Sequence, residues 1–201
     1  LPLAWVQMAP TRRQRTEPGV TPAAIGVDLV DVASFGEQLC QEGSVFHRVF
    51  TAREWNAALR FAPEQGASSA GQFPSGHLQT SAALPSSGPS VPELPTRALH
   101  SLAARWAAKE AFIKAWSSLY YGREDPLKST DIDWAQIEVV CDRWGRPAFR
   151  FHGRIASELD KTQEELKASF SWLLSLSHDG NYAIAWVSVN QTDLREAKEF
   201  S

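Results

Sequence analysis

The sequence predicts a single α+β domain, in which a small antiparallel sheet packs against one long central helix and several shorter helices. Residues 102–117 contain six alanines and neither proline nor glycine, a composition typical of a long helix. Residues 170–187 alternate apolar and polar side chains around Asp179-Gly180, a pattern typical of a β-hairpin. With 201 residues, of which 43% are hydrophobic, the chain can form one substantial core, and a second full domain is not expected.

Composition argues against several classes of partner. The net charge of −3 does not suit binding to a nucleic-acid backbone. No apolar run approaches the roughly 20 residues that a membrane helix needs, so no membrane partner is expected. The two cysteines, Cys40 and Cys141, lack CxxC spacing and form no disulfide framework, which indicates a reducing, cytoplasmic setting.

The predicted domain covers residues 23–189. Residues 1–22 form a flexible leader, of which 1–7 are either an appended remnant or an extended start, because the only methionine is Met8. Residues 62–96 are crowded with Ser, Pro, Gly, Ala and Gln, which predicts a mobile insertion that is either tolerated or acts as a lid. Residues 190–201 form a C-terminal tail.

The first half of the domain alternates between strand and helix signals. Residues 23–30 are apolar and β-branched over strand length, and a short helix is expected over 32–41, ended by Gly43. Residues 51–54 form a capping box at the start of a second helix. We expect Trp55, Leu59 and Ala58 to face inward there, and we expect no chemistry from this helix.

The second half adds two hairpins and a helix. Strands are expected over residues 137–142 and again around Phe149 and Phe151, joined by a Trp144-Gly145 turn, and a helix over 153–166. In the last hairpin the predicted register pairs three apolar residues across one face, with His178 at the open end of that face. The expected pairs are Leu176 with Ala183, Leu174 with Ala185, and Trp172 with Val187.

Charged side chains at the edges of these apolar patterns are the candidates for chemistry. At about 100° per residue, Glu110 lies about 40° from the apolar stripe of the long helix, and Lys114 follows one turn later. Asp28 interrupts the first strand, where an unpaired carboxylate is costly. Taken singly, these features also suit a surface ion pair, an edge-strand aspartate and a structural histidine at position 178.

Together the acids suit a magnesium site. Mg²⁺ prefers oxygen ligands and commonly takes one or two protein carboxylates together with substrate phosphates. Lys114 and Arg105 could neutralise the remaining phosphate charge. The sequence contains no HExxH, P-loop or GxGxxG motif. Metal-assisted phosphoryl-group chemistry, with Asp28 and Glu110 as metal ligands, is therefore the predicted class of reaction.

Several stretches closely resemble the small holo-acyl-carrier-protein synthases, which are 4′-phosphopantetheinyl transferases. The stretches are IGVDLV at 25–30, FTxRE at 50–54, LAARWAAKEAFIKAW at 102–116, IEVVCDRWGRP at 137–147 and SLSH at 175–178. The resemblance covers residues 23–189 apart from the insertion. It implies the fold of that family and transfer of the phosphopantetheine arm of coenzyme A to a serine of an apo acyl carrier protein, for fatty acid biosynthesis. The co-product is adenosine 3′,5′-bisphosphate, and Mg²⁺ is the implied cofactor.

The resemblance also assigns residues. Asp28 and Glu110 match the family's metal-binding acids, and Glu110 or metal-bound water is the candidate acceptor of the serine proton. Coenzyme A contacts are implied for Lys114, for His178 and for the Gly145-Arg146-Pro147 turn, the last of these beside the adenine. Arg105, from its place on the long helix, and the backbone at Ser117 are the other expected coenzyme contacts. This chain departs from the family pattern at three positions, because Ser34 replaces a common arginine, Ser117 a common glycine, and Val30 the second acid of larger relatives.

Two further expectations follow from the resemblance. Members of this length form homotrimers with active sites between subunits, and the partner is a free acyl carrier protein or the carrier domain of a fatty acid synthase. Because carrier proteins are acidic, we expect Arg48, Arg53 and Arg60 to form the docking surface. A non-catalytic coenzyme A-binding subunit that kept the fold, or another Mg²⁺-dependent phosphodiester enzyme, are the alternatives.

Overall fold

The computed structural model describes residues 20–60 and 94–193 of the chain. Most of the predicted leader, residues 62–93 of the predicted 62–96 insertion, and the tail beyond position 193 lie outside the described residues. The division into leader, domain, insertion and tail therefore stays a prediction.

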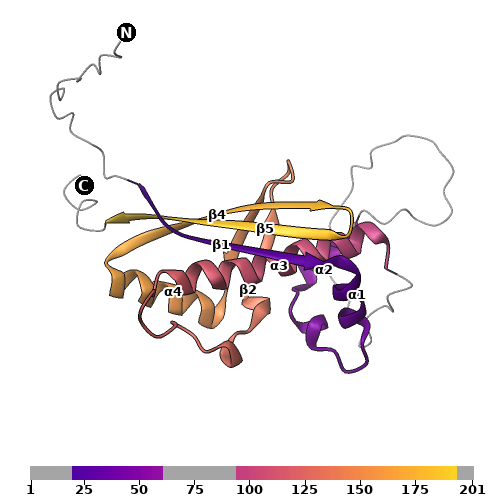
Figure 1. Cartoon of the computed structure of the whole chain (residues 1–201), viewed down its shortest axis with the longest axis horizontal. Coiled ribbons are helices and arrows are strands. Elements are labelled where there is room, and N and C mark those ends of the chain that lie inside the picture. Colours follow the sequence, from indigo (N-terminus) through magenta and orange to yellow (C-terminus); the bar gives the residue numbers. More distant parts are fainter. Residues whose placement is uncertain (1–19, 61–93, 194–201) are drawn as a thin grey trace, which may run out of the picture.

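The predicted α+β class is confirmed, with the strands divided between two antiparallel sheets (Figure 1). The larger sheet has the order β1-β5-β4 and is built from β1 (Thr21–Asp31), β4 (Ala168–Asp179) and β5 (Tyr182–Asp193). The smaller sheet is the hairpin of β2 (Ile137–Cys141) and β3 (Pro147–Phe151).

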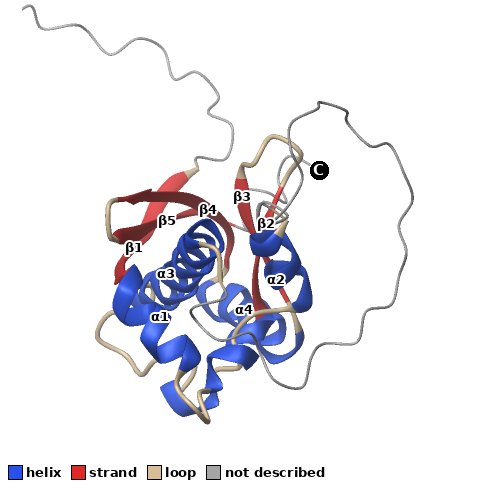
Figure 2. Ribbon diagram, turned by 90° about the vertical axis from the view of Figure 1, so that its right-hand side faces the viewer, coloured by secondary structure: helices blue, strands red, loops and turns tan. Residues whose placement is uncertain are grey.

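The helices are α1 (Val32–Cys40), α2 (Ala52–Leu59), α3 (Thr96–Ser118) and α4 (Gly153–Leu166). Short 3₁₀ turns occupy Val45–Arg48, Ser129–Asp131 and Trp134–Gln136. Figure 2 shows α3 between the three-stranded sheet and the β2–β3 hairpin, so this helix forms the centre of the molecule. None of the helices over 20–60 and 94–193 has the length and apolar character needed to cross a bilayer.

Helix α3 is longer and more deeply buried than the sequence predicts. It starts at Thr96, six residues before the expected residue 102, directly after Pro95. Its alanines pack against both sheets and allow close approach on several sides, so Lys109 is fully buried and Arg105 is only 7% exposed. The single apolar stripe predicted for this helix is therefore too narrow a description.

The last hairpin has the predicted faces but a different register. Leu176 pairs with Ala185, Leu174 with Val187, and Trp172 with Val189, each two residues from the predicted partner. The turn residues are Gly180 and Asn181, because Asp179 pairs with Tyr182. A shift of two residues keeps every side chain on the same face, so the predicted apolar face is confirmed and the predicted pairing is wrong.

Three smaller expectations also need correction. Of the three side chains expected to face inward on α2, Ala58 is buried and Trp55 half-buried, but Leu59 is 38% exposed, and Glu54 near the start of the helix is buried as well. On β2, alternation predicts that Ile137, Val139 and Cys141 share one face and Glu138 the other. Ile137 and Val139 are buried, but Cys141 is exposed and Glu138 is buried, where its carboxylate accepts a hydrogen bond from Thr51 Oγ1 (3.0 Å). Strand β5 continues to Asp193, four residues into the stretch expected to be tail.

Strand β1 is two-faced, although its composition suggests a fully buried strand. Its residues Gly26, Asp28 and Val30 face α3, whereas the residues between them face outward. Several outward side chains of the three-stranded sheet are large and apolar, and in the described residues these remain 36–60% exposed. They are Ile25, Val27, Leu29, Leu173, Tyr182, Ile184 and Trp186, and we call them the outer sheet face.

Candidate active site

The candidate site lies where the backbones of β1 and α3 approach closely. A Cβ atom on Gly26 would lie 2.0 Å from the carbonyl oxygen of Ala111 and 2.7 Å from the backbone nitrogen of Ala115. Only glycine fits this position, because any side chain would overlap the backbone of the helix. The contact places the side chain of Asp28, two residues along the same face of β1, beside α3.

Asp28, Glu110 and Lys114 meet at this junction, as the sequence analysis predicts. Asp28 is 8% exposed, and its Oδ1 accepts a hydrogen bond from Lys114 Nζ at 2.6 Å. Lys114 reaches in from a largely exposed position and also donates to the carbonyl oxygen of Val27 at 3.4 Å. Glu110, one turn before Lys114 on α3, lies near enough to Asp28 for the two carboxyl groups to interact electrostatically.

The environment of Glu110 perturbs its titration. Burial and, after it, the neighbouring carboxylate of Asp28 together raise the pKa of Glu110 from 4.5 to about 7, while Lys114 opposes the shift. Two carboxyl groups this close cannot both ionise without a compensating cation, and Lys114 supplies one positive charge for two acids. The junction is therefore a place where an additional cation would be stabilised.

The donor set at the junction fits Mg²⁺. Asp28 Oδ2 is buried and has no hydrogen-bond partner, so one hard oxygen donor is left for a ligand. Asp28 and Glu110 provide the one or two carboxylates that Mg²⁺ commonly takes from a protein. In the described residues no cluster of three or more His, Cys, Asp and Glu side chains is present, so water and substrate oxygens must complete the coordination shell.

A second group of predicted residues meets about 8 Å further toward the start of α3, at 1.5 Å per residue. Arg105 and His178 line a hollow of about 300 Å³ together with Arg97, Ser101, Ala104 and Leu176. Arg105 Nη1 donates to the carbonyl oxygen of Ser101 (3.0 Å) and to its hydroxyl, whereas the buried Arg105 Nε has no partner. A buried guanidinium with an unused donor beside a second arginine favours an anion in this hollow.

The remaining predicted coenzyme contacts lie elsewhere. The Ser117 hydroxyl, at the end of α3, donates to Asp125. Gly145, Arg146 and Pro147 lie at the tip of the β2–β3 hairpin, where Arg146 Nε donates to Asp142 Oδ2 (2.7 Å). Neither group lines the hollow of Arg105 and His178, so their assigned contacts stay predictions.

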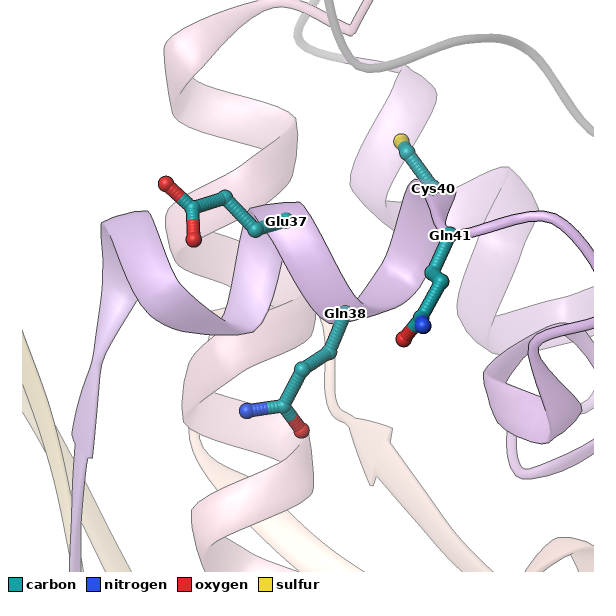
Figure 3. Close-up of a pocket in the computed structure, with 4 residues that line it drawn as sticks. All are labelled: Glu37, Gln38, Cys40 and Gln41. Atoms are coloured by element: carbon teal, nitrogen blue, oxygen red, sulfur yellow. The ribbon is translucent and has the colours of Figure 1, made fainter.

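Another hollow, of about 490 Å³, lies beside α1 and is lined by Glu37, Gln38, Cys40 and Gln41. Figure 3 shows that these four side chains leave one helix in different directions. They do not converge on a common point, which a binding site requires. This hollow is therefore not part of the candidate site.

Sequence reasoning missed two kinds of residue. Arg97 and Ser101 belong to the cationic hollow. They lie two turns and one turn before Arg105, in the part of α3 that precedes the predicted start of the helix at residue 102. Glu54 and Lys109 form a buried ion pair. The available signal was the run of alanines around Lys109. Alanines indicate a helix face that packs closely, and a charge on such a face needs a buried partner.

Fold and site together suit a substrate with several phosphates, because acids and cations from β1 and α3 gather along this helix. Residues 24–187 match the 4′-phosphopantetheinyl transferase superfamily, and the chain belongs to this family. The resemblance on which the sequence analysis relied is thereby confirmed.

Similar proteins carry the name holo-[acyl-carrier-protein] synthase. The chain is 39% identical to the one from Corynebacterium efficiens over 162 residues, which cover 81% of this chain and 89% of that protein. It is 35% identical to the one from Mycobacterium tuberculosis over 161 residues, which cover 80% and 91%. Among solved structures, the ACPS–CoA complex from Chronobacterium ammoniagenes superposes with a TM-score of 0.61 at 34% identity, covering 83% of this chain and 95% of that one.

Proposed function

We propose that this protein is a holo-acyl-carrier-protein synthase. It transfers the 4′-phosphopantetheine arm of coenzyme A to a serine of an apo acyl carrier protein and releases adenosine 3′,5′-bisphosphate. The observation that carries the proposal is the junction of Asp28, Glu110 and Lys114, in which two acids and a lysine from separate elements converge on one point. Relatives bearing this enzyme name, and one solved as a complex with CoA, support it.

The reaction needs a nucleophile, a proton acceptor and stabilisation of phosphate charge. The carrier serine attacks the phosphorus that bears the pantetheine arm, and the bond from that phosphorus to the bridging oxygen breaks, leaving adenosine 3′,5′-bisphosphate. Glu110, or water on the metal, is the proposed acceptor of the serine proton, because a carboxylate or metal-bound hydroxide placed beside the attacking hydroxyl can take up its proton. Lys114 holds the phosphate oxygens and stabilises their charge as the bridging bond breaks.

The proposed cofactor is Mg²⁺, held by Asp28 Oδ2 and Glu110. When bound there, it supplies the positive charge that a pyrophosphate between two acids requires. The two acids distinguish this junction from a simple anion site, which needs only cations.

Coenzyme A suits both candidate phosphate sites along α3, the junction and the cationic hollow, because it carries a pyrophosphate and a separate 3′-phosphate. We assign the pyrophosphate to the junction, and the 3′-phosphate to the hollow of Arg97, Arg105 and His178. In this assignment Arg105 uses its unpartnered Nε to bind phosphate.

The proposed assembly is a homotrimer formed through the outer sheet face. Exposed apolar side chains from all three strands, such as Leu29 (60% exposed), Leu173 (55% exposed) and Trp186 (49% exposed), lie on this face. A surface of this kind marks an association site. Burying it between copies of the chain would complete the sheet's second core.

The carrier protein is proposed to dock on the surface formed by Arg48, Arg53 and Arg60. All three side chains are exposed, whereas α1 has no lysine or arginine. Reversing these three charges should weaken carrier binding strongly at low salt and less at high salt, while coenzyme A binding is unchanged. Unchanged carrier affinity in the triple variant would show that the docking surface lies elsewhere.

The proposed setting is fatty acid biosynthesis in the cytoplasm. Cys40 and Cys141 are not joined by a disulfide, which suits a reducing compartment. The carrier is either a free protein or a domain of a fatty acid synthase.

The experiment that tests the proposal is mass spectrometry of an apo acyl carrier protein after incubation with this protein, coenzyme A and Mg²⁺. A gain equal to the mass of the phosphopantetheine arm is expected, with no gain for a carrier that lacks the acceptor serine. Coenzyme A binding without any mass gain on several carriers would indicate the non-catalytic binding subunit instead.

A further inference from the structure

A buried ion pair joins two stretches of the sequence that show no relation to each other. Lys109 Nζ lies 3.1 Å from Glu54 Oε2, and both side chains are completely inaccessible to solvent. Lys109 belongs to α3 and Glu54 to α2, 55 positions earlier in the chain. An ion pair with no solvent contact is rare, because each charge must be fully compensated within the protein.

Lys109 uses its whole donor capacity inside the core. Besides Glu54, its ammonium group donates to the carbonyl oxygens of Trp134 (3.0 Å) and Ile137 (2.5 Å), at the start of β2. A lysine ammonium has three donors, so none is left over. The fixed directions of these three bonds hold the lysine, and with it the turn of α3 that carries it, against β2.

Glu54 is fixed just as firmly. Its Oε2 also accepts from the backbone nitrogen of Thr51 (2.8 Å), which is the capping box at the start of α2. Its Oε1 accepts from the backbone nitrogen of Val139 on β2 (3.0 Å). The carboxylate therefore ties together α2, α3 and β2 at a single point.

Folding stability alone does not explain why a buried ion pair occupies this position. Burial lowers the pKa of Lys109, and the charge of Glu54 opposes this shift, so the desolvation cost is large and only partly offset. Apolar side chains of similar volume often serve stability equally well or better. What a network of directional bonds adds is a defined geometry.

The bonds of Lys109 affect the candidate active site, because Lys109 directly precedes Glu110 in α3. The two side chains leave the helix about 100° apart, Lys109 toward α2 and β2 and Glu110 toward Asp28 on β1. A carboxylate about 6 Å from a helix axis moves by about 1 Å when the helix turns by about 10°. Rotation of α3 would thus pull Glu110 away from Asp28, and the three bonds of Lys109 oppose such a rotation.

We propose that Glu54 and Lys109 are a positioning pair, which sets the rotation of α3 and thereby holds the Glu110 carboxylate beside Asp28. The inference rests on the proposed function for its meaning in catalysis. The placement of the two acids can be tested separately from catalysis, because it determines how tightly the protein binds a divalent cation.

The test compares Glu54→Gln, Lys109→Met and the double variant with the unaltered chain. Each single change leaves an uncompensated buried group and lowers the urea midpoint of unfolding, whereas the double variant removes both charges and recovers most of that loss. The matched control is Thr162→Val. It removes the hydroxyl that binds Trp116 Nε1 (3.0 Å) and Tyr120 Oη (3.0 Å) and so loosens α3 at its other end.

Three quantities are measured for each variant: the urea midpoint, the dissociation constant of Mn²⁺ by electron paramagnetic resonance, and kcat and KM for the transfer. In the double variant we expect stability near that of the unaltered chain and Mn²⁺ binding weaker by about tenfold or more. We also expect kcat to fall while KM for coenzyme A changes little. Thr162→Val should lose stability and keep its affinity for Mn²⁺.

A double variant that binds Mn²⁺ as tightly as the unaltered chain overturns the inference and leaves the pair a purely structural feature. So does an equal loss of Mn²⁺ affinity in Thr162→Val, because general destabilisation then explains the effect. If no variant transfers the arm but the double variant binds Mn²⁺ more weakly than the unaltered chain, the proposed function fails and the positioning role stands.

Discussion

Replacing Gly26 with alanine should separate the two acids without touching either of them. The new Cβ atom would lie 2.0 Å from the Ala111 carbonyl oxygen, whereas such contacts essentially never fall below 3.0 Å. Both contacted atoms belong to the backbone of α3, so no side-chain rotation relieves the overlap. Strand and helix must move apart by about 1 Å at this point, and Asp28 moves with the strand.

Two magnitudes follow from that displacement. Overpacking of this kind lowers the free energy of unfolding by about 1–3 kcal/mol. A displacement of about 1 Å between groups that act on one substrate can lower the rate on the order of 100-fold. Loss of transfer should therefore exceed what the fraction of unfolded protein explains.

The assay compares the rate of holo carrier formation with the urea midpoint of the same preparation. Gly36→Ala is the matched control, because Gly36 lies inside α1 and its added Cβ would meet only the flexible end of Leu99, at 3.1 Å. Alanine is favoured over glycine within a helix, so this control should remain active and at least as stable. A Gly26→Ala protein that transfers the arm at the unaltered rate would refute the idea that close approach of β1 and α3 builds the site.

Three other predictions concern charge and assembly. The pKa of Glu110 is raised from 4.5 to about 7 in the folded protein, so between these two pH values the folded protein holds a proton that the unfolded chain has released. The stability of the metal-free protein therefore falls as the pH rises from 4.5 to about 7. Glu110→Gln should therefore raise the melting temperature more at about pH 8 than at about pH 4.5, and an equal effect at both would contradict the assigned shift. Arg105→Met should raise KM for coenzyme A on the order of tenfold and leave KM for dephospho-coenzyme A nearly unchanged, because only the former carries the 3′-phosphate. Trp186→Arg should convert the assembly to monomers in sedimentation velocity, whereas Glu164→Arg on α4 should not; a trimer that survives Trp186→Arg would place the interface elsewhere.

The sequence predicted the elements better than their contacts. The capping box of Thr51 and Glu54 is present as predicted, because its geometry depends on four consecutive residues. The register of the last hairpin was wrong by two residues, since Asp179-Gly180 and Gly180-Asn181 are both acceptable turns and both keep the apolar residues on one face.

Long-range contacts explain what sequence reasoning could and could not find in the site. Asp28 and Glu110 stood out because each interrupts an apolar pattern, and the structure brings them together. The ion pair of Glu54 was not predicted, because the capping box alone is a sufficient reason for a glutamate at that position. Its pairing with Lys109 depends on how α2 packs against α3, and no local pattern in the sequence encodes that.

The most direct test of the whole account is to measure holo carrier protein and adenosine 3′,5′-bisphosphate together in one reaction. The unaltered chain with Mg²⁺ should form both in equal amounts, and removal of the metal with EDTA or the change Glu110→Gln should abolish both. Full activity of Glu110→Gln, or transfer that persists in EDTA, would contradict a metal site between Asp28 and Glu110.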